Sequence, residues 1–258
     1  MLKYLRKSEM YLNSFKTTLA ESLQKEKNIK WFKQYYHLFE GKSGFEIGGP
    51  SPLFSGDIFP IYQLAETIDG CNFSNTTVWE GEIKSSIYEY YKNKKGVQYI
   101  SEGSDLQTIQ DEQYDFLLSC HNLEHIANPI KAITEWKRVV RKGGAILLVL
   151  PDKRFTFDKK RPYTTFEHIL DDFNNDTAED DLTHLPEVLQ LHYIKLDPGS
   201  DEGFEKFKSR CEQNFQNRCL HHHVFSPDLL KQMLEYLGIE VVAQKFVPSI
   251  HQVIIGKK

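Results

Sequence analysis

Short apolar runs alternate with helix-compatible or loop segments over most of the chain. Seven stretches have the apolar and β-branched content of strands: 43–47, 64–73, 97–101, 114–119, 145–150, 239–246 and 250–255. Alternation of this kind among the first five is typical of a doubly wound, mostly parallel sheet. The last two are separated only by Val247, Pro248 and Ser249, which predicts a hairpin and an antiparallel last strand. The pattern therefore predicts an α/β fold.

The clearest single unit is a strand, a helix and a strand between Tyr114 and Asp152. Residues 130–140 repeat apolar side chains at helical spacing, and residues 145–150 are continuously apolar, as in a strand covered on both faces. Ligands of open parallel sheets bind beyond the carboxyl ends of the strands. We therefore expect residues 119–125 and 151–154 to face one crevice.

Two segments depart from this alternation. Residues 1–40 combine basic side chains with apolar ones at helical spacing, which predicts a helical extension that packs on the domain or on a second subunit of a homodimer. A membrane-surface or RNA-binding role is the alternative. Within the main domain, residues 41–258, the segment 152–222 has no strand pattern and holds seven carboxylates between Asp171 and Glu187. A segment this long predicts a lid over the substrate, inserted after the fifth strand.

Composition narrows the class of partner. The chain has 258 residues, with 32 Lys and Arg against 36 Asp and Glu, so its net charge of −4 disfavours a nucleic-acid polymer. Its four cysteines form no CxxC pair, which indicates reduced thiols. Because neither a signal-peptide pattern nor an apolar run of about 18 residues occurs, we expect a cytoplasmic protein that does not use a membrane.

Four motifs at strand ends resemble those of the class I S-adenosylmethionine-dependent methyltransferases, over roughly residues 42–256. The first is Glu46 at the end of the first strand, followed by Gly48 and Gly49. In that family this loop lies against the methionine part of the cofactor, where a Cβ would keep the backbone away. Pro50 and Pro52 stand where later glycines are common; they also argue against nicotinamide binding, which needs G-x-G-x-x-G opening a helix.

The other three motifs follow in order along the chain. Asn72 matches the residue that accepts hydrogen bonds from the ribose, with Asp69 and Glu80 as alternatives. Residues 101–106 resemble the adenine motif, and the strand, helix and strand unit is the fourth motif. The resemblance implies a seven-stranded sheet of order 3-2-1-4-5-7-6. It also implies a set of residues that contact S-adenosylmethionine: Glu46, Gly48, Gly49, Asn72, Glu102, Ser104, Asp105, Leu106, Ser119 and Cys120.

Histidines supply the candidate chemistry. Methyl transfer from a sulfonium to a hydroxyl needs a base or a metal, because a hydroxyl is a weak acid. His121, Glu124 and His125 share one face if a helix starts near 121, and His221 to His223 precede the helix start predicted at Ser226-Pro227. The pairing is similar to the metal-dependent small-RNA 2′-O-methyltransferases, which implies Mg²⁺ or Mn²⁺ held by His121, Glu124, His125 and His223.

Two alternatives to the metal stay open. The Glu124-His125 pair can simply pack and cap the helix. His121 then becomes the general base, since imidazole titrates near neutral pH, and Asp152 is the second catalytic candidate. Lys153 and Arg154 are candidates for binding an anionic substrate, together with His222.

The predicted function is that of an O-methyltransferase acting on a small polar acceptor. A nucleotide-linked sugar supplies both a diol for a metal and a phosphate for the basic residues, and the chain resembles bacterial methyltransferases that modify capsule or lipopolysaccharide sugars. One alternative is a small-molecule C- or N-methyltransferase with His121 as base. The other is a non-catalytic methyltransferase-like subunit recruited through residues 1–40.

Overall fold

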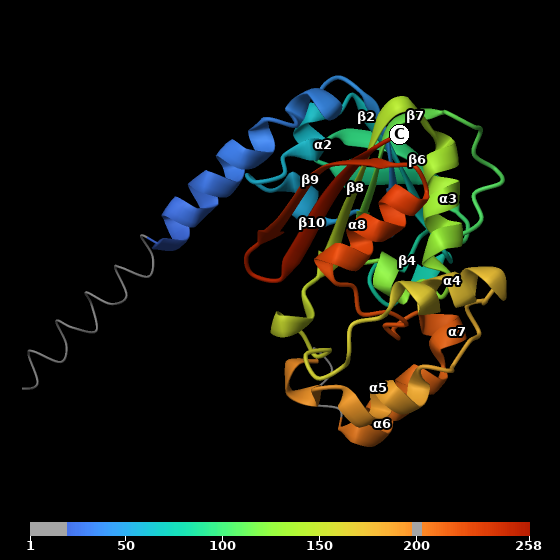
Figure 1. Ribbon diagram of the computed structural model, residues 1–258. Coiled ribbons are helices and arrows are strands. Elements are labelled where there is room, and N and C mark those ends of the chain that lie inside the picture. Colours follow the sequence, from blue (N-terminus) through green and yellow to red (C-terminus); the bar gives the residue numbers. More distant parts are fainter. Residues whose placement is uncertain (1–19, 198–202) are drawn as a thin grey trace, which may run out of the picture.

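The computed structural model describes residues 20–197 and 203–258, and its centre is one eight-stranded sheet (Figure 1). The strand order is β5-β6-β2-β1-β7-β8-β10-β9. β6, β2, β1, β7 and β8 run parallel, whereas β10 is antiparallel to both of its neighbours. The strands are β1 Ser43–Ile47, β2 Thr67–Asn72, β5 Ile87–Tyr91, β6 Lys94–Ile100, β7 Tyr114–Cys120, β8 Val140–Pro151, β9 Glu240–Val247 and β10 His251–Lys257. The predicted α/β class with a mostly parallel sheet is confirmed.

The predicted count of seven strands is wrong, because β5 adds an antiparallel strand at the edge beside β6. Only Lys92 and Asn93 separate the two strands, and Lys92 takes the left-handed conformation with φ of 48°. Tight hairpin turns usually carry Gly or Asn-Gly at such positions. Lys92 gives no such turn signal in the sequence.

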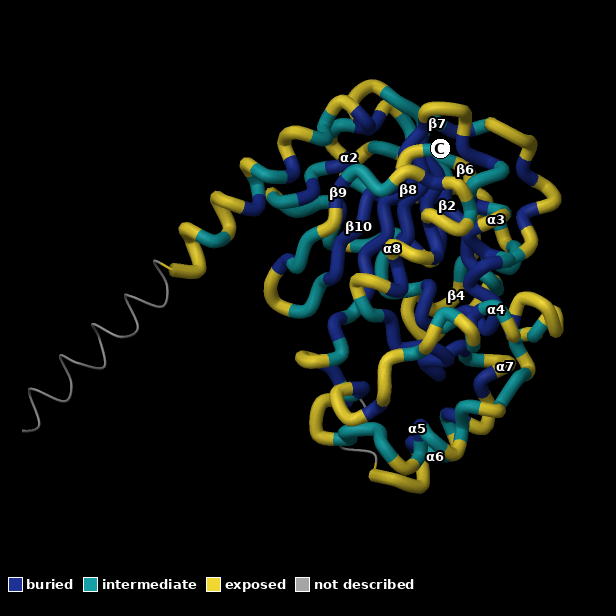
Figure 2. The backbone as a smooth tube through the Cα atoms, in the orientation of Figure 1, coloured by how far each residue is buried: buried dark blue, intermediate teal, exposed yellow. Residues whose placement is uncertain are grey.

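Helices cover both faces of the sheet, and the side chains of the central strands alternate between two cores. Phe116, Leu118 and Leu147 belong to one core, and Leu117 and Ile146 belong to the other. Figure 2 shows these strands as the buried centre of the molecule. Burial on both faces explains why these strands read as continuous apolar runs.

α3 (Pro129–Val139) and α8 (Pro227–Tyr236) cover one face, while α2 (Ile61–Leu64) and the helix 20–33 lie on the other side (Figure 1). The predicted helix start at Ser226-Pro227 is confirmed, since the Ser226 hydroxyl accepts a hydrogen bond from Leu229 N at 3.1 Å. Single turns of 3-10 helix are η1 Tyr36–Leu38, η2 Pro52–Ser55, η3 Leu123–His125, η4 Lys153–Phe155 and η5 Ile194–Leu196.

The described part of the segment after β8 folds into helices beyond the carboxyl ends of the strands (Figure 1). Its helices are α4 Phe166–Asn174, α5 Leu185–Leu191, α6 Phe204–Glu212 and α7 Asn214–Asn217. α5 and α6 share a small core, built from Val188, Phe207, Cys211 and Leu220, whereas Ile169 of α4 belongs to the core that also contains α3 and α8. We call residues 152–222 the insertion.

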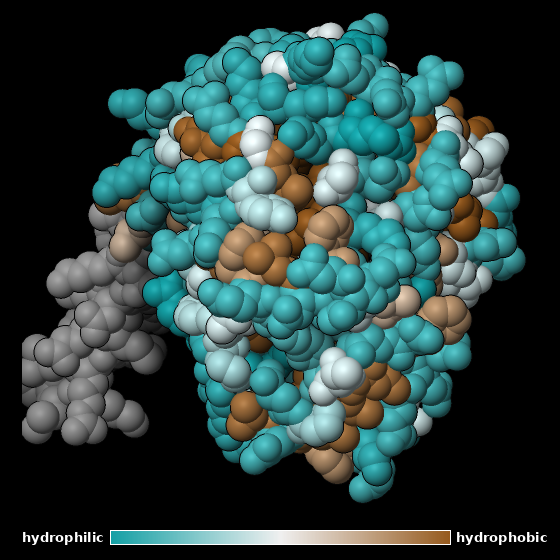
Figure 3. Space-filling view, turned by 45° about the vertical axis from the view of Figure 1, so that its right-hand side comes forward, coloured by the Kyte–Doolittle hydropathy of each residue, from teal (hydrophilic) through white to brown (hydrophobic). Residues whose placement is uncertain are grey.

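Residues 1–19 of the predicted helical extension lie outside the described residues, but residues 20–33 are helical. Phe32 is fully buried in the core, and Lys245 Nζ of β9 lies 4.8 Å from the centre of the Trp31 ring. The face shown in Figure 3 is mostly hydrophilic, with small separate hydrophobic areas. None of the helices in the described ranges is long and apolar enough to cross a membrane.

Candidate active site

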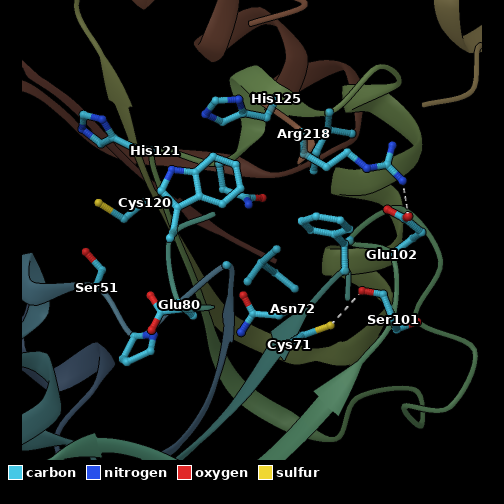
Figure 4. Close-up of a pocket in the computed structure, with 18 of the residues that line it drawn as sticks. Ser51, Cys71, Asn72, Glu80, Ser101, Glu102, Cys120, His121, His125 and Arg218 are labelled. Carbon is cyan, nitrogen blue, oxygen red and sulfur yellow. Dashed lines mark hydrogen bonds and ion pairs between the residues drawn. The ribbon is translucent and has the colours of Figure 1, made fainter. Parts of the chain in front are cut away.

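A cavity of about 600 Å³ opens where the carboxyl ends of β1, β2 and β7 meet (Figure 4). Of the residues predicted to face one crevice, Cys120, His121, Asn122 and His125 line this cavity, whereas none of residues 151–154 does. Residues at the ends of these strands form its walls: Ile47, Gly48, Cys71, Asn72, Cys120 and His121.

The loop after β1 approaches the cavity closely because it begins with two glycines. Gly48 has φ of +74°, and a Cβ there would lie 2.4 Å from Asn122 Nδ2. A Cβ on Gly49 would lie 2.2 Å from the Tyr88 hydroxyl. A side chain at Gly48 would clash with Asn122, and one at Gly49 would clash with Tyr88 and Glu46, so both glycines are required by packing.

Glu46 lies beneath this loop and does not line the cavity. Its carboxylate accepts hydrogen bonds from the hydroxyls of Tyr62 and Tyr88, both at 2.7 Å, and from Ser51 N at 3.0 Å. Burial raises the pKa of Glu46 to about 7, against the lowering effect of these three donors. The geometry makes Glu46 a positioning residue that holds the loop.

Asn72 and Glu80 offer oxygen atoms on the wall of the cavity. Asn72 Nδ2 donates to Gly49 O at 3.1 Å, which leaves its Oδ1 as the acceptor for a ligand. Glu80 lies in the small ribbon of β3 (Thr76–Thr77) and β4 (Gly81–Glu82), and burial raises its pKa. Asp69, the other sequence candidate, instead accepts from the Tyr114 hydroxyl and Val97 N, both at 2.7 Å.

The adenine motif contributes only part of its residues to the cavity. Glu102 lines it and pairs with Arg218 at 2.5 Å, as Figure 4 shows. Burial raises the pKa of Glu102, and the charge of Arg218 opposes this shift. Ser104, Asp105, Leu106 and Ser119 lie outside the lining, with Leu106 fully buried in the core.

Arg218 was not found from the sequence, since it comes from the insertion. Its guanidinium also pairs with Glu179 at 3.2 Å and lies 5.2 Å from the Phe73 ring. Arg218 has a left-handed backbone conformation, with φ of 52°, but nothing in the local sequence predicts this conformation.

A second cavity of about 660 Å³ adjoins the first, and the two share Trp79, His121 and His125. The insertion forms most of its other walls, with Asp158, His192, Arg210 and His221 among the polar residues. The Trp79 ring lies edge-on to His125, with 5.3 Å between ring centres. A ligand in one cavity would therefore be in reach of a ligand in the other.

Glu124, His125 and His221, which we call the pocket cluster, meet at the wall of the second cavity. Their ligand atoms lie within 4.8 Å of one another. Leu220 O contacts His125 Nδ1 at 3.2 Å, and Asp158 Oδ2 contacts His221 Nδ1 at 2.5 Å. Backbone carbonyl and carboxylate partners of this kind fix the tautomer of metal-binding imidazoles and leave Nε2 for the metal.

Glu124 completes the pocket cluster with a carboxylate that lacks hydrogen bonds. Both of its oxygens are buried and have no hydrogen-bond partner within residues 20–197 and 203–258. Burial raises the pKa of Glu124 to about 7. An orphaned buried carboxylate beside two imidazoles is the environment that a cation would satisfy.

The predicted metal set of His121, Glu124, His125 and His223 is not brought together. The helix expected from position 121 begins only at Pro129, and His121 has φ of 49°. The His121 ring therefore turns to His251, 2.9 Å between ring nitrogens. His221 joins Glu124 and His125, while His223 lies in another group with His168.

His121 lines both cavities, but its surroundings make it a poor base. Burial, followed by the nearby His251 and His221, lowers its pKa to about 3. A neutral imidazole of such low basicity removes a proton from a hydroxyl less readily than a free one does.

The other candidates for acceptor binding lie outside the lining of both cavities. Asp152 is buried and forms an ion pair of 2.5 Å with Arg154, whose side chain is 61% exposed. Lys153 Nζ donates to Arg161 O, and His222 Nε2 contacts the Asn214 amide at 3.1 Å. Of these residues, Arg154 is the one exposed enough to reach a ligand.

A family model described as "Methyltransferase domain" matches residues 60–148, which include β2, β7 and α3. The chain is also similar to the crystal structure of an S-adenosylmethionine-dependent methyltransferase from Mesorhizobium loti. The two have a TM-score of 0.50 and 8% identity over 85% of this chain and 92% of the other. The family match is limited to residues 60–148, and the likeness to the solved structure shows that this chain has the fold of an S-adenosylmethionine-dependent methyltransferase.

Two further proteins are similar over different lengths. A methyltransferase structure from Aquifex aeolicus has a TM-score of 0.46 and 13% identity, over 89% of this chain and 88% of that one. An uncharacterized protein of Methanocaldococcus jannaschii is 41% identical over 61 residues, which are 23% of this chain. That match spans 29% of the relative's length.

Proposed function

We propose that the protein is an O-methyltransferase that transfers a methyl group from S-adenosylmethionine to a hydroxyl of a small polar acceptor. The observation that carries this proposal is the shared wall of the two cavities at Trp79, His121 and His125. The first cavity, at the strand ends, is the cofactor side. The second, closed by the insertion, is the acceptor side.

The first cavity fits the cofactor on three counts. Gly48 keeps open a space that a Cβ would fill, Asn72 Oδ1 is free to accept from a ribose hydroxyl, and the Glu80 carboxylate favours a positively charged ligand. The cofactor supplies a methyl group on a cationic sulfur. Asn72 and the Gly48 loop would hold it, and Trp79 would form part of the wall that it shares with the second cavity.

The pocket cluster fits a divalent cation that takes nitrogen as well as oxygen ligands. Two imidazoles and one carboxylate suit Mn²⁺ better than Mg²⁺, which strongly prefers oxygen. Such an ion, when bound, lowers the pKa of an alcohol. Asp158 and Leu220 O orient the two imidazoles, and the low basicity of His121 favours this arrangement over direct base catalysis.

A nucleotide-linked sugar is the acceptor that these surroundings support best. The second cavity has both polar and aromatic walls, including Phe157, His192 and Arg210. Arg154 is next to Phe155 on its rim and is exposed, so it can leave Asp152 for a phosphate. A sugar diol would then lie at the pocket cluster.

The test begins with calorimetric titration of the purified protein with S-adenosylmethionine and S-adenosylhomocysteine, with and without Mn²⁺. We expect micromolar binding of both. Formation of S-adenosylhomocysteine is then followed with a panel of nucleotide-linked sugars and with the free sugars as controls. Failure to bind either cofactor form would refute the proposal and favour a non-catalytic subunit.

Gly48→Ala provides a matched test of the cofactor side. The new Cβ would lie 2.4 Å from Asn122 Nδ2, so we expect S-adenosylmethionine affinity to fall about tenfold or more. Gly41→Ala is the control, because Gly41 has a similar φ of +67° but no atom within 4 Å of the added Cβ. Equal loss of affinity in both variants would mean that backbone strain, and not the cavity, causes the effect.

A further inference from the structure

Four residues outside both cavities form a second group of potential ligands: His168, Asp172, His184 and His223. We call them the insertion cluster. Each offers one ligand atom, and the four atoms lie within 4.8 Å of one another. The chemistry of the pocket cluster uses none of them.

The contacts within the insertion cluster have the dimensions of a coordination shell. His168 Nε2 lies 3.0 Å from His184 Nε2 and 3.4 Å from Asp172 Oδ2. Ligand atoms about 2.0–2.1 Å from a tetrahedral Zn²⁺ are about 3.3 Å apart. The four side chains therefore surround a space that suits a zinc ion.

Two atoms of the cluster are buried without a hydrogen-bond partner in the described part of the chain: Asp172 Oδ2 and His223 Nδ1. Asp172 Oδ1 accepts from the Thr177 hydroxyl at 3.1 Å, so this carboxylate is fixed by one oxygen and open at the other. His223 Nε2 contacts Ala127 O at 3.1 Å, and its side chain is completely buried. A metal-binding imidazole commonly donates its other N–H to a carbonyl in this way.

The cluster joins elements that are far apart in the sequence. His168 and Asp172 are one turn apart on α4, His184 immediately precedes α5, and His223 follows the pocket ligand His221 by two residues. His222 N donates to Glu124 O at 2.8 Å. Metal ligation by His223 and the hydrogen bond from His222 N to Glu124 O would together link α4 and α5 of the insertion to the backbone that carries the pocket cluster.

We propose that the insertion cluster is a structural zinc site. Three imidazoles and one carboxylate give it four protein ligands and a closed shell, as in zinc sites that stabilise folds. The ion would hold α4 and the start of α5 against His223, and so fix the wall of the acceptor cavity.

The test measures metal content and thermal unfolding, which do not depend on methyl transfer. The full-length protein is purified from zinc-supplemented medium, dialysed and analysed for metals. We expect one firmly held zinc per chain, lost in His184→Gln but kept in Glu124→Gln and in the control His37→Gln, whose exposed ring has Nδ1 2.9 Å from Gln34 O. Removal of the zinc by a strong chelator should lower the unfolding temperature of the wild type.

If His184→Gln folds poorly, a second measurement on the wild type tests the zinc site without this variant. Metal-free wild type is titrated with Co²⁺, and we expect the intense visible bands of a tetrahedral nitrogen and oxygen site at one equivalent. The proposal is overturned if wild type neither retains zinc nor gains these bands. It is also overturned if Glu124→Gln loses the zinc while His184→Gln keeps it.

Discussion

The pocket cluster and the insertion cluster contain the same kinds of ligand but differ in what surrounds them. Glu124, His125 and His221 line the second cavity, and three ligands would leave a coordination position for a substrate. The insertion cluster has four ligands and lines neither cavity. Ligand number and access to a cavity therefore separate a catalytic from a structural role, although both clusters depend on the segment from His221 to His223.

His221→Ala should break the pocket cluster with the largest effect. Loss of one ligand from a three-residue site should lower kcat/KM for the acceptor by about 10²–10⁴-fold. Affinity for S-adenosylmethionine should stay near wild type, because His221 does not line the first cavity. Steady-state kinetics and calorimetry check the two halves, with His37→Ala as control. A loss of less than tenfold would mean that the pocket cluster is not catalytic.

Arg161→Leu should disturb both clusters by destabilising the segment between them. Arg161 is 1% exposed, pairs with Asp158 at 3.0 Å and donates to the carbonyls of His221 and His222. Removing one partner of a buried ion pair costs about 3–5 kcal/mol, since the other charge remains buried. Urea unfolding measures this loss of free energy of unfolding.

Arg141→Leu is the matched control for that measurement. Arg141 also forms an arginine–carboxylate pair, with Asp115 at 2.8 Å, but its side chain is 50% exposed. We expect it to cost about 1 kcal/mol or less. Equal losses in the two variants would show that burial of Arg161 is not the cause.

Glu46 can be compared with Glu124, since both are buried carboxylates. Glu46 accepts three hydrogen bonds from the protein, whereas Glu124 accepts none from the described residues. The folded pKa of Glu46, about 7, exceeds the ordinary 4.5, so the folded state keeps a proton that the unfolded state releases. Stability from this group is therefore highest at low pH and falls as pH rises from about 4.5 to about 7, by about 3 kcal/mol in total.

Glu46→Gln should remove that pH dependence. Urea unfolding of both proteins at about pH 5 and about pH 8 gives the difference in free energy of unfolding at each pH, which cancels the contributions of other groups. We expect the wild type to lose most of about 3 kcal/mol relative to the variant on going to the higher pH. A pH-independent difference would mean that Glu46 is ionised throughout.

The sequence predicted the residues of the first cavity better than those of the second. The reason is that the first is built from strand ends described by local patterns, whereas the second depends on contacts between residues far apart in the chain. The strands, the loop at Gly48 and the position of Asn72 follow from local patterns, because strand ends in a parallel sheet meet at one edge. Glu102 could also be placed from its motif. Its partner Arg218 could not, because the insertion brings it across 116 residues.

The arrangement of the candidate metal-binding histidines was even harder to predict from local sequence patterns. The spacing of His121, Glu124 and His125 was read on a helix, but only one turn of 3-10 helix, Leu123–His125, is present and His121 turns away. Which member of the run 221–223 joins Glu124 depends on an irregular segment held by Asp158 and Arg161. No periodicity describes such a segment, so the sequence selected His223 where the structure brings His221.

Asp158→Asn is the mildest way to separate the two clusters, because Arg161 keeps its other ion pair, with Glu187 at 2.8 Å. Asp158 touches His221 and Arg161 but no residue of the insertion cluster, and its oxygen 2.5 Å from His221 Nδ1 orients that ring. Changing a carboxylate that orients a metal-binding histidine typically costs 10–100-fold in metal affinity or activity. We expect a loss in this range for Mn²⁺-dependent turnover, with the zinc content unchanged. Loss of zinc together with turnover would mean that the clusters form one cooperative site; turnover equal to wild type would mean that Asp158 does not position His221, whose orientation the backbone alone would then set.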